Sequence, residues 1–261
     1  GYQREHGQVV TDKSEAFVPT KTPSLTGSAV SFLIITNEDM EDEFQVLADY
    51  KTSLGIPTVV ATTDFITQNY RNGADIQDTI RMYIRDAYEK WGIEYVLLGG
   101  DSDILPPRYV ENFFYPNPGS TFIPVDLYFA CLDGNWNDNG NAHYGEPADL
   151  PGFPGDLVDF AEEVYIGRAT VSTSEAATVF VDKVLTYESA GPSDDWTNRV
   201  LFAAEVLFPE DWPNGNYIIL DGAQYDDQQV NDYIIPCTDM EYMRMYQTDT
   251  LFEWDAPLSR A

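Results

Sequence analysis

The sequence is short of positive charge. It has 14 Lys and Arg residues against 44 Asp and Glu residues, a formal net charge of −30 over 261 residues. Phosphate recognition needs clustered basic side chains, so this balance excludes nucleic-acid or anionic-membrane binding as a main role. No apolar run approaches the roughly 18 residues that a membrane span requires. The acidity instead suits a solvated extracellular surface, divalent cations or a salty habitat.

Cysteine and histidine are also scarce, with two of each. Cys131 and Cys237 could pair, but two cysteines make neither a disulfide framework nor a metal cluster. Hydrophobic residues make up 43% of the chain and aromatic residues 14%. That content is enough for a real core and excludes a disordered chain.

Short apolar runs alternate with segments of helical periodicity in the first 100 residues. We expect strands at 31–36, 56–61 and 94–99, separated by helices over 39–54 and 75–91. Strands joined by helices through short connections form right-handed crossovers and a parallel sheet. The fold class predicted is therefore α/β, a parallel sheet with flanking helices.

The same sequence signals predict further strands and helices after residue 100. We expect strands at 125–130 and 163–168, then a helix capped by Thr173 or Ser174. The Gly/Pro/Asp stretch 191–195 marks a boundary, after which a strand at 199–205 opens a second α/β unit with a helix over 222–233 and a strand over 242–246. The predicted parts are a linker or extended arm (1–29), an N-terminal α/β subdomain (30–191) and the start of a second, incomplete one (192–261).

The stretch 131–146 carries the spacing of a calcium loop. Counted from Asn135, oxygen-bearing side chains fall at positions 1, 3 and 5, a glycine at 6 and a glutamate at 12. Calcium prefers six to eight oxygen ligands, and alternate side chains of a tight loop point inward. We expect Ca²⁺ to bind through Asp133, Asn135, Asn137, Asn139, the backbone carbonyl of Asn141, and Glu146. The alternative is an Asn/Asp/Gly-rich surface turn that holds no ion.

Two acidic residues, Asp101 and Asp103, follow the third predicted strand. Ligands of open parallel sheets gather at the carboxyl ends of strands. Pro106-Pro107 rules out the helix that a dinucleotide site would need. Asp101 therefore either caps a turn or has a structural metal or hydrogen-bonding role.

The order of these pieces resembles the gingipain-type cysteine endopeptidases over about residues 30–260. The matching stretches are 48–60, Tyr95-Val-Leu-Leu-Gly-Gly-Asp101 with Ile104 and Pro106, Val125-Asp-Leu-Tyr128, Glu163-Val-Tyr-Ile-Gly-Arg168 and the helix to Tyr187-Glu188. The resemblance implies a caspase-like α/β/α fold in two subdomains, structural calcium ions, secretion, and hydrolysis of peptide bonds in protein or peptide substrates by a Cys/His pair.

The sequence departs from that family at the catalytic pair. The family's His-Gly motif, followed after a strand by the cysteine, does not occur after residue 200. The resemblance carries over only Glu163, which is similar to the family's acidic residue that orients the catalytic histidine. Glu163 could equally be a strand-edge acid that faces water.

Three interpretations of function follow. The first is the N-terminal part of a secreted, calcium-supported cysteine endopeptidase whose His/Cys dyad lies in a C-terminal part beyond Ala261, so that the chain alone is inactive. The second is a non-catalytic, calcium-binding extracellular interaction module on the same scaffold. The third is a local site made by Cys131 and His143, which is disfavoured because nearby acids would raise the pKa of a thiol.

Overall fold

The structure is a computed structural model that describes residues 20–23, 29–111, 122–141, 143–146, 155–156, 158, 160–191, 194–207, 220–247 and 252–258. Most of the expected arm, 1–29, and His6 lie outside these residues. The chain divides into two compact units, Gly1–Thr186 and Tyr187–Ala261, and each is described by itself.

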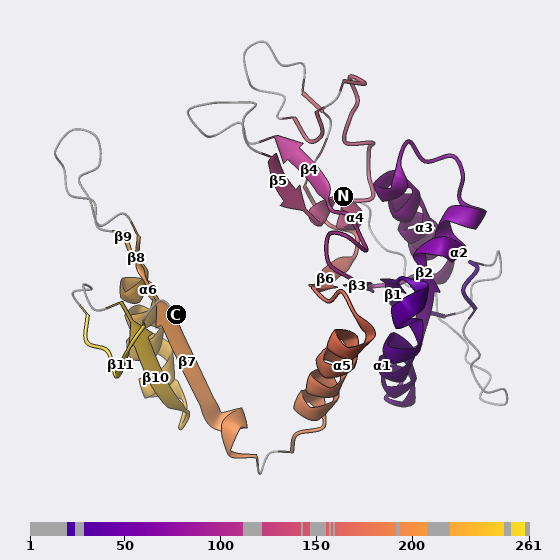
Figure 1. Ribbon diagram of the computed structural model, residues 1–261. Helices are drawn as coiled ribbons and strands as arrows, with labels where there is room; N and C mark the ends of the chain where they lie inside the picture. The colour runs from indigo at the N-terminus through magenta and orange to yellow at the C-terminus, as the bar shows by residue number, and fades with distance from the viewer. Residues whose placement is uncertain are drawn as a thin grey trace. The chain divides into compact units, whose positions relative to one another are not determined.

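The first unit is built on a four-stranded parallel sheet, coloured indigo to orange in Figure 1. The strand order is β2-β1-β3-β6, and the strands are β1 (Phe32–Thr36), β2 (Thr58–Thr62), β3 (Tyr95–Gly99) and β6 (Tyr165–Ala169). Phe32 is in register with both Thr58 and Tyr95, and Tyr95 is in register with Tyr165. The strands predicted at 31–36, 56–61, 94–99 and 163–168 are all present, displaced by at most two residues at either end.

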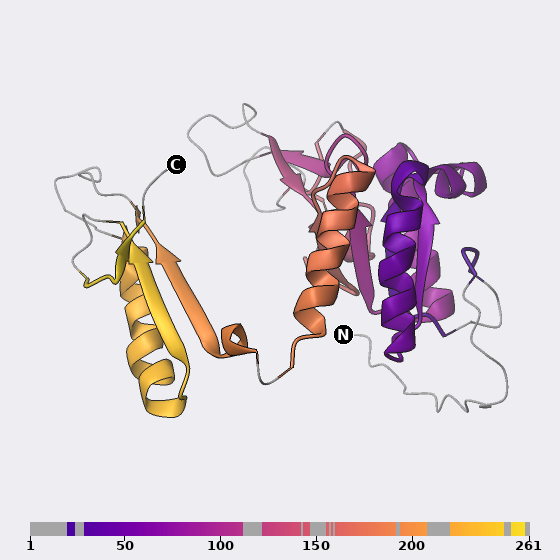
Figure 2. The same cartoon turned by 60° about the horizontal axis from the view of Figure 1, so that its bottom comes forward.

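Helices cover both faces of this sheet, because its apolar residues alternate between two cores. On one face, Ile80 and Ile84 of α3 pack with Leu33 and Ile35 of β1. On the other, Phe44 packs with Ile34 and with residues of α5, and α1 and α5 lie side by side (Figure 2). The helical elements are η1 (Glu38–Met40), α1 (Glu41–Ser53), α2 (Thr63–Asn69), α3 (Ile76–Trp91) and α5 (Ser174–Glu188).

The ends of α3 follow from two residues that flank it. The Asp75 side chain caps the first turn by accepting from the N–H of Asp78 at 2.8 Å. Gly92 ends the helix in the left-handed conformation, with φ 77°. The helix 75–91 was predicted from its periodic apolar face and from Gly92 as its stop.

One predicted strand, 125–130, is wrong. Residues in this region form an antiparallel hairpin of β4 (Arg108–Glu111) and β5 (Phe122–Val125), and then one helical turn, α4 (Leu127–Ala130). Tyr128, Phe129 and Ala130 are all buried, so the segment has no exposed face for an alternating strand pattern to show. A short apolar run such as 127–130 fits either a strand or a helical turn, and periodicity cannot separate the two.

The second unit holds a parallel sheet of order β11-β10-β7. Its strands are β7 (Arg199–Ala204), β10 (Glu241–Tyr246) and β11 (Ala256–Pro257), with a short hairpin of β8 (Val206–Leu207) and β9 (Leu220–Asp221). The helix predicted over 222–233 is present as α6 (Gly222–Gln229), which runs into a π-helical turn, η3 (Val230–Ile234), and then α7 (Ile235–Cys237). A 3₁₀ turn, η2 (Asp195–Asn198), precedes β7. None of the helices described in either unit is long and apolar enough to cross a membrane.

Candidate cation-binding loop and strand-end cluster

Arg168 organises the carboxyl end of the first unit's sheet. Its guanidinium pairs with both carboxylate oxygens of Asp126, each at 2.7 Å. It also donates to the carbonyls of Gly100 and Leu105 at 2.7 and 2.8 Å. Planar guanidinium suits such paired acceptors. Arg168 thus joins the ends of β3 and β6 to the turn after β3.

Asp101 lies in that turn, and its carboxylate accepts hydrogen bonds there. Its carboxylate accepts from the Ser172 hydroxyl at 2.6 Å and from the N–H of Asp103 at 3.1 Å. These hydrogen bonds hold the pKa of Asp101 below its usual range. This arrangement corresponds to the turn-capping alternative, with Asp103 exposed beside it.

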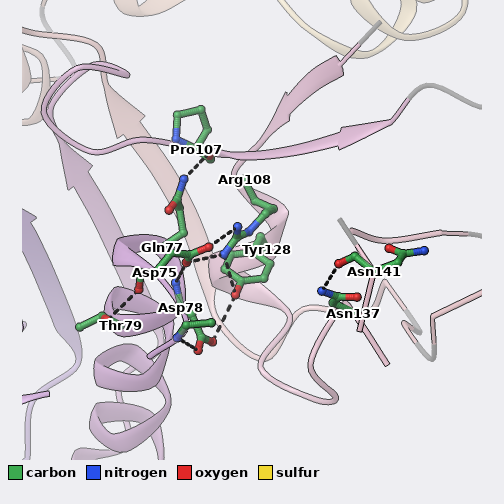
Figure 3. Close-up of polar contacts among 10 residues, drawn as sticks. Asp75, Gln77, Asp78, Thr79, Pro107, Arg108, Tyr128, Asn137 and Asn141 are labelled. Atoms are coloured by element: carbon green, nitrogen blue, oxygen red, sulfur yellow. Dashed lines mark hydrogen bonds and ion pairs between the residues drawn. The ribbon is translucent and has the colours of Figure 1, made fainter. Parts of the chain in front are cut away.

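Arg108 is the centre of a buried polar cluster beside α3 (Figure 3). It donates to both carboxylate oxygens of Asp75 at 2.8 Å and to the Tyr128 hydroxyl at 3.1 Å. Its guanidinium also lies 4.4 Å from the ring centre of Tyr128 and 4.0 Å from that of Tyr144. Burial raises the pKa of Tyr128 to about 12. Because Tyr144 belongs to the 131–146 stretch, this cluster fixes the end of the candidate loop against α3.

Arg81 fixes the beginning of the same loop. Although it lies on α3, it is 1% exposed and donates to the carbonyls of Cys131, Asp133 and Gly134. The loop is therefore held to one helix at both ends.

Within the loop, successive side chains fold the backbone by accepting from the amide two residues further on. Asn135 accepts from Asn137 at 2.9 Å, Asn139 from Asn141 at 2.9 Å, and Asn141 from His143 at 2.6 Å. Gly140 has φ 68°, as a tight turn requires. A carbonyl oxygen has two lone pairs, so one hydrogen bond leaves each side chain able to coordinate a cation. The same bonds also stabilise a turn that holds no ion.

Two buried carboxylates lie at this loop, Glu146 within it and Asp156 in the stretch that follows it. Glu146 is 1% exposed and Asp156 4%. Asp156 accepts from the amides of Asp138 and Glu146, at 2.7 and 3.1 Å. Oε2 of Glu146 accepts from the side-chain amides of Asn139 and Asn141, at 2.6 and 2.7 Å, whereas its Oε1 is buried without a hydrogen-bond partner. Buried carboxylates without a counter-charge are costly, and the described residues place no basic side chain in an ion pair with either.

These residues fit a calcium ion in part. Glu146 Oε1 and the side-chain oxygen of Asn137 are both buried and without a hydrogen-bond partner, as ligands for a cation would be. Asp133 and Asn135 are exposed, and the Asn141 carbonyl accepts from Asn137 at 2.8 Å (Figure 3). No three His, Cys, Asp or Glu side chains converge as a metal site among the described residues. An ion here would therefore depend on amide and backbone oxygens beside Glu146.

The remaining predicted residues lie elsewhere. Glu163 precedes β6, and its carboxylate accepts from the N–H of Leu132 at 2.5 Å. Its role in orienting a histidine stays a prediction. Cys131 and Cys237 are not joined in a disulfide; Cys131 is buried at 1% exposure and Cys237 is exposed in the second unit. Burial closes the Cys131 thiol to a substrate.

The parallel sheet between two helical layers defines a protein of the caspase-like α/β type. The family model of peptidase family C25 matches residues 26–258, and the chain belongs to that family. This confirms the resemblance to the gingipain-type endopeptidases. A comparison with curated proteins found no match.

Two of the solved structures that match this chain come from Porphyromonas gingivalis. The complex of RgpB pro- and mature domains matches at a TM-score of 0.54 and 19% identity, over 84% of this chain and 43% of that one. Dimeric latent PorU matches at a TM-score of 0.46 and 18% identity, over 64% of this chain and 16% of that one. The chain thus spans less than half the length of either, and the likeness to RgpB supports the fold alone.

Sequence reasoning missed Asp156 and Arg81. Asp156 lies in the Pro/Gly-rich stretch after the loop, where acidic residues are scattered singly and lie outside the calcium-loop spacing. Arg81 sits among apolar positions of α3, and a charge at such a position was the signal that an internal partner exists.

Proposed function

We propose that this chain is the N-terminal part of a secreted cysteine endopeptidase, supported by calcium, that hydrolyses peptide bonds in protein or peptide substrates. The observation that carries the proposal is the match of peptidase family C25 to residues 26–258. Membership of this family implies cysteine-peptidase chemistry for the parent protein. The acidic surface and the cation-type loop favour an extracellular setting.

The nucleophile and its base belong, in this proposal, to the part of the parent that follows Ala261. Cys131 is buried, which closes its thiol to a substrate. A thiol attacks as its thiolate and needs a neighbouring imidazole to form it. No motif of His-Gly, strand and cysteine occurs after residue 200.

The test compares the 261-residue chain with the complete parent protein on a mixed peptide library. We expect turnover by the parent that a thiol alkylating reagent abolishes, and none by the 261-residue chain. In the parent, Cys131→Ala and Cys237→Ala should leave the rate unchanged. Turnover by the short chain that Cys131→Ala removes would show that the local thiol is the nucleophile, and an inactive parent would favour the interaction module.

We propose Glu163 as the residue that orients the catalytic histidine. It borders a cavity of about 390 Å³, together with Glu94, Tyr95, Glu162, Val164 and Tyr165. A carboxylate on the far nitrogen of an imidazole fixes its tautomer and stabilises its protonated form. Glu163→Gln in the parent should lower kcat by roughly two orders of magnitude and shift its pH profile. Glu162→Gln is the matched control, and equal rates for both variants would refute the assignment.

Calcium is proposed to bind in the 133–146 loop. When bound, the ion would supply positive charge beside two buried carboxylates and join the two halves of the loop. Glu146 would hold it through Oε1, with Asn137 and the other predicted oxygens contributing around it. The atoms that these residues offer as metal ligands are all oxygens, which suits calcium better than zinc.

Melting curves in calcium and in chelator test this site. Calcium at about 100 times its dissociation constant should add about 2.7 kcal/mol of stability, which raises Tm by roughly 5–10 °C for a domain of this size. Glu146→Ala should remove most of that response. Glu89→Gln, an exposed carboxylate on α3, should keep it. Identical curves for the wild type in both conditions would mean that the loop is a turn without an ion.

A further inference from the structure

We propose that Arg81 is a positioning residue that sets the affinity of the 133–146 loop for its cation. The inference rests on the calcium site proposed above and extends it to a side chain on α3. Arg81 donates no hydrogen bond to any predicted ligand side chain. It acts on the loop through the backbone.

Among the described residues, every hydrogen bond of Arg81 goes to the start of the loop. Nε and Nη2 donate to the Cys131 carbonyl at 3.0 and 2.6 Å. Nη2 also donates to Asp133 at 2.7 Å, and Nη1 donates to Gly134 at 3.1 Å. One planar guanidinium therefore aligns three carbonyls within four residues. The next residue, Asn135, is the first position of the calcium spacing.

Burial makes this arrangement rigid. Arg81 is 1% exposed, its guanidinium lies 5.0 Å from the ring centre of Tyr128, and its acceptors are neutral carbonyls. Burial lowers the pKa of Arg81 below its usual range, although an arginine remains charged. A buried charge without an ion-pair partner in the described part of the chain is costly, so the three carbonyls must stay in place to solvate it. The side chain and the loop backbone thus hold each other.

Loop geometry at this end decides how many oxygens can reach one ion. Calcium needs several ligands at 2.3–2.6 Å at once. A loop that must first be ordered binds more weakly, because binding then includes the cost of ordering it. Residues that orient metal ligands change affinity by roughly 10–100-fold when they are replaced.

The experiment titrates Ca²⁺ into the 261-residue chain by calorimetry. Arg81→Lys keeps the charge but replaces the planar fork by a single ammonium. We expect its Kd for calcium to rise by roughly 10-fold or more. Arg85→Lys is the matched control, since Arg85 lies one turn away and its one hydrogen bond to the described residues is a 3.4 Å contact with Gly134. Its Kd should stay within about twofold of the wild type.

The outcomes distinguish failure of the positioning role of Arg81 from failure of the calcium site on which it rests. If the wild type binds and Glu146→Ala does not, but Arg81→Lys binds like the wild type, the positioning role is refuted and the site stands. If the wild type does not bind, the site and the inference both fall. Tighter binding by Arg81→Met would mean that charge repulsion outweighs positioning, and would also refute the inference.

Folding of the variant is followed by near-ultraviolet circular dichroism. If Arg81→Lys is unfolded in chelator, calcium at 100 times the wild-type Kd is added. The positioning role predicts that this concentration stabilises the variant by at most about 1.4 kcal/mol, against about 2.7 kcal/mol for the wild type, because its Kd is at least tenfold higher. A gain in the variant equal to that of the wild type would refute it.

Discussion

Replacement of Asp75 by Asn tests the cluster that anchors the end of the loop. Asn is a good N-cap, so it keeps the hydrogen bond to the N–H of Asp78. It removes the charge that faces both donors of Arg108. Charge-assisted hydrogen bonds contribute about 1.5–3 kcal/mol each, but the Asp75 side chain is 34% exposed, which screens the pair. We therefore expect Asp75→Asn to lower the free energy of unfolding by about 2 kcal/mol.

The pH dependence of this loss has a definite sign. Burial alone would raise the pKa of Asp75, but hydrogen bonds from Arg108 and from the Asp78 amide hold it below its usual range. A depressed pKa contributes stability that is complete above the unfolded value, about 3.9, and is lost as the pH falls through the folded value. The difference between wild type and Asp75→Asn should therefore be constant from pH 7 to about pH 5 and shrink below about pH 4.

Urea unfolding followed by circular dichroism measures both effects. Asp75→Ala should lose about 1 kcal/mol more than Asp75→Asn, because it also lacks the cap. Asp64→Asn, an acidic residue in the first turn of α2 that forms no ion pair with any described residue, should lose only about 0.5 kcal/mol. If Asp75→Asn is as stable as Asp64→Asn at pH 7, the buried pair does not stabilise the fold as argued.

Two further predictions concern packing and thiol access. A Cβ on Gly99 would lie 2.7 Å from the Phe44 ring, so Gly99→Ala should lower the free energy of unfolding in urea by about 1–3 kcal/mol. Gly167→Ala is the control, because a Cβ there meets nothing within 4 Å. Equal stabilities of the two variants would contradict the packing of Gly99 against Phe44. Cys237 should react with a thiol reagent in the native chain and Cys131 only after unfolding, as peptide mapping would show, and fast labelling of Cys131 would contradict its burial.

The sequence predicted those elements that carry their own local signals. The helix α3 has a cap residue, a periodic apolar face and a glycine stop, and it was placed within one residue. Apart from Asp126, the segment 125–130 has only apolar side chains. Asp126 pairs with Arg168, which is 42 residues away in the sequence. Its helical turn therefore depends on a tertiary contact that no local pattern reports.

The candidate loop shows the same limit. Its spacing marked Asn137 and Glu146, and both have a buried oxygen without a hydrogen-bond partner. The prediction also included Asn135, the first position of the spacing, and Asp133 just before it, and the structure leaves both exposed. Whether a side chain in such a loop faces inward is decided by what supports the backbone from outside. That support comes from Arg81 and Arg108, 50 and 36 residues away from the residues they contact.

The position of β6 has a consequence for the order of folding. Tyr165 of β6 is in register with Tyr95 of β3, and the segment between these two strands contains a hairpin, α4 and the loop. The Arg168 guanidinium on β6 binds Asp126, Gly100 and Leu105, all of which belong to that segment or its start. We therefore predict that strand β6 joins the sheet only after the segment has taken shape, and that until then the edge of β3 is open to pairing with another chain. Conditions that slow the folding of this segment should promote aggregation through β3.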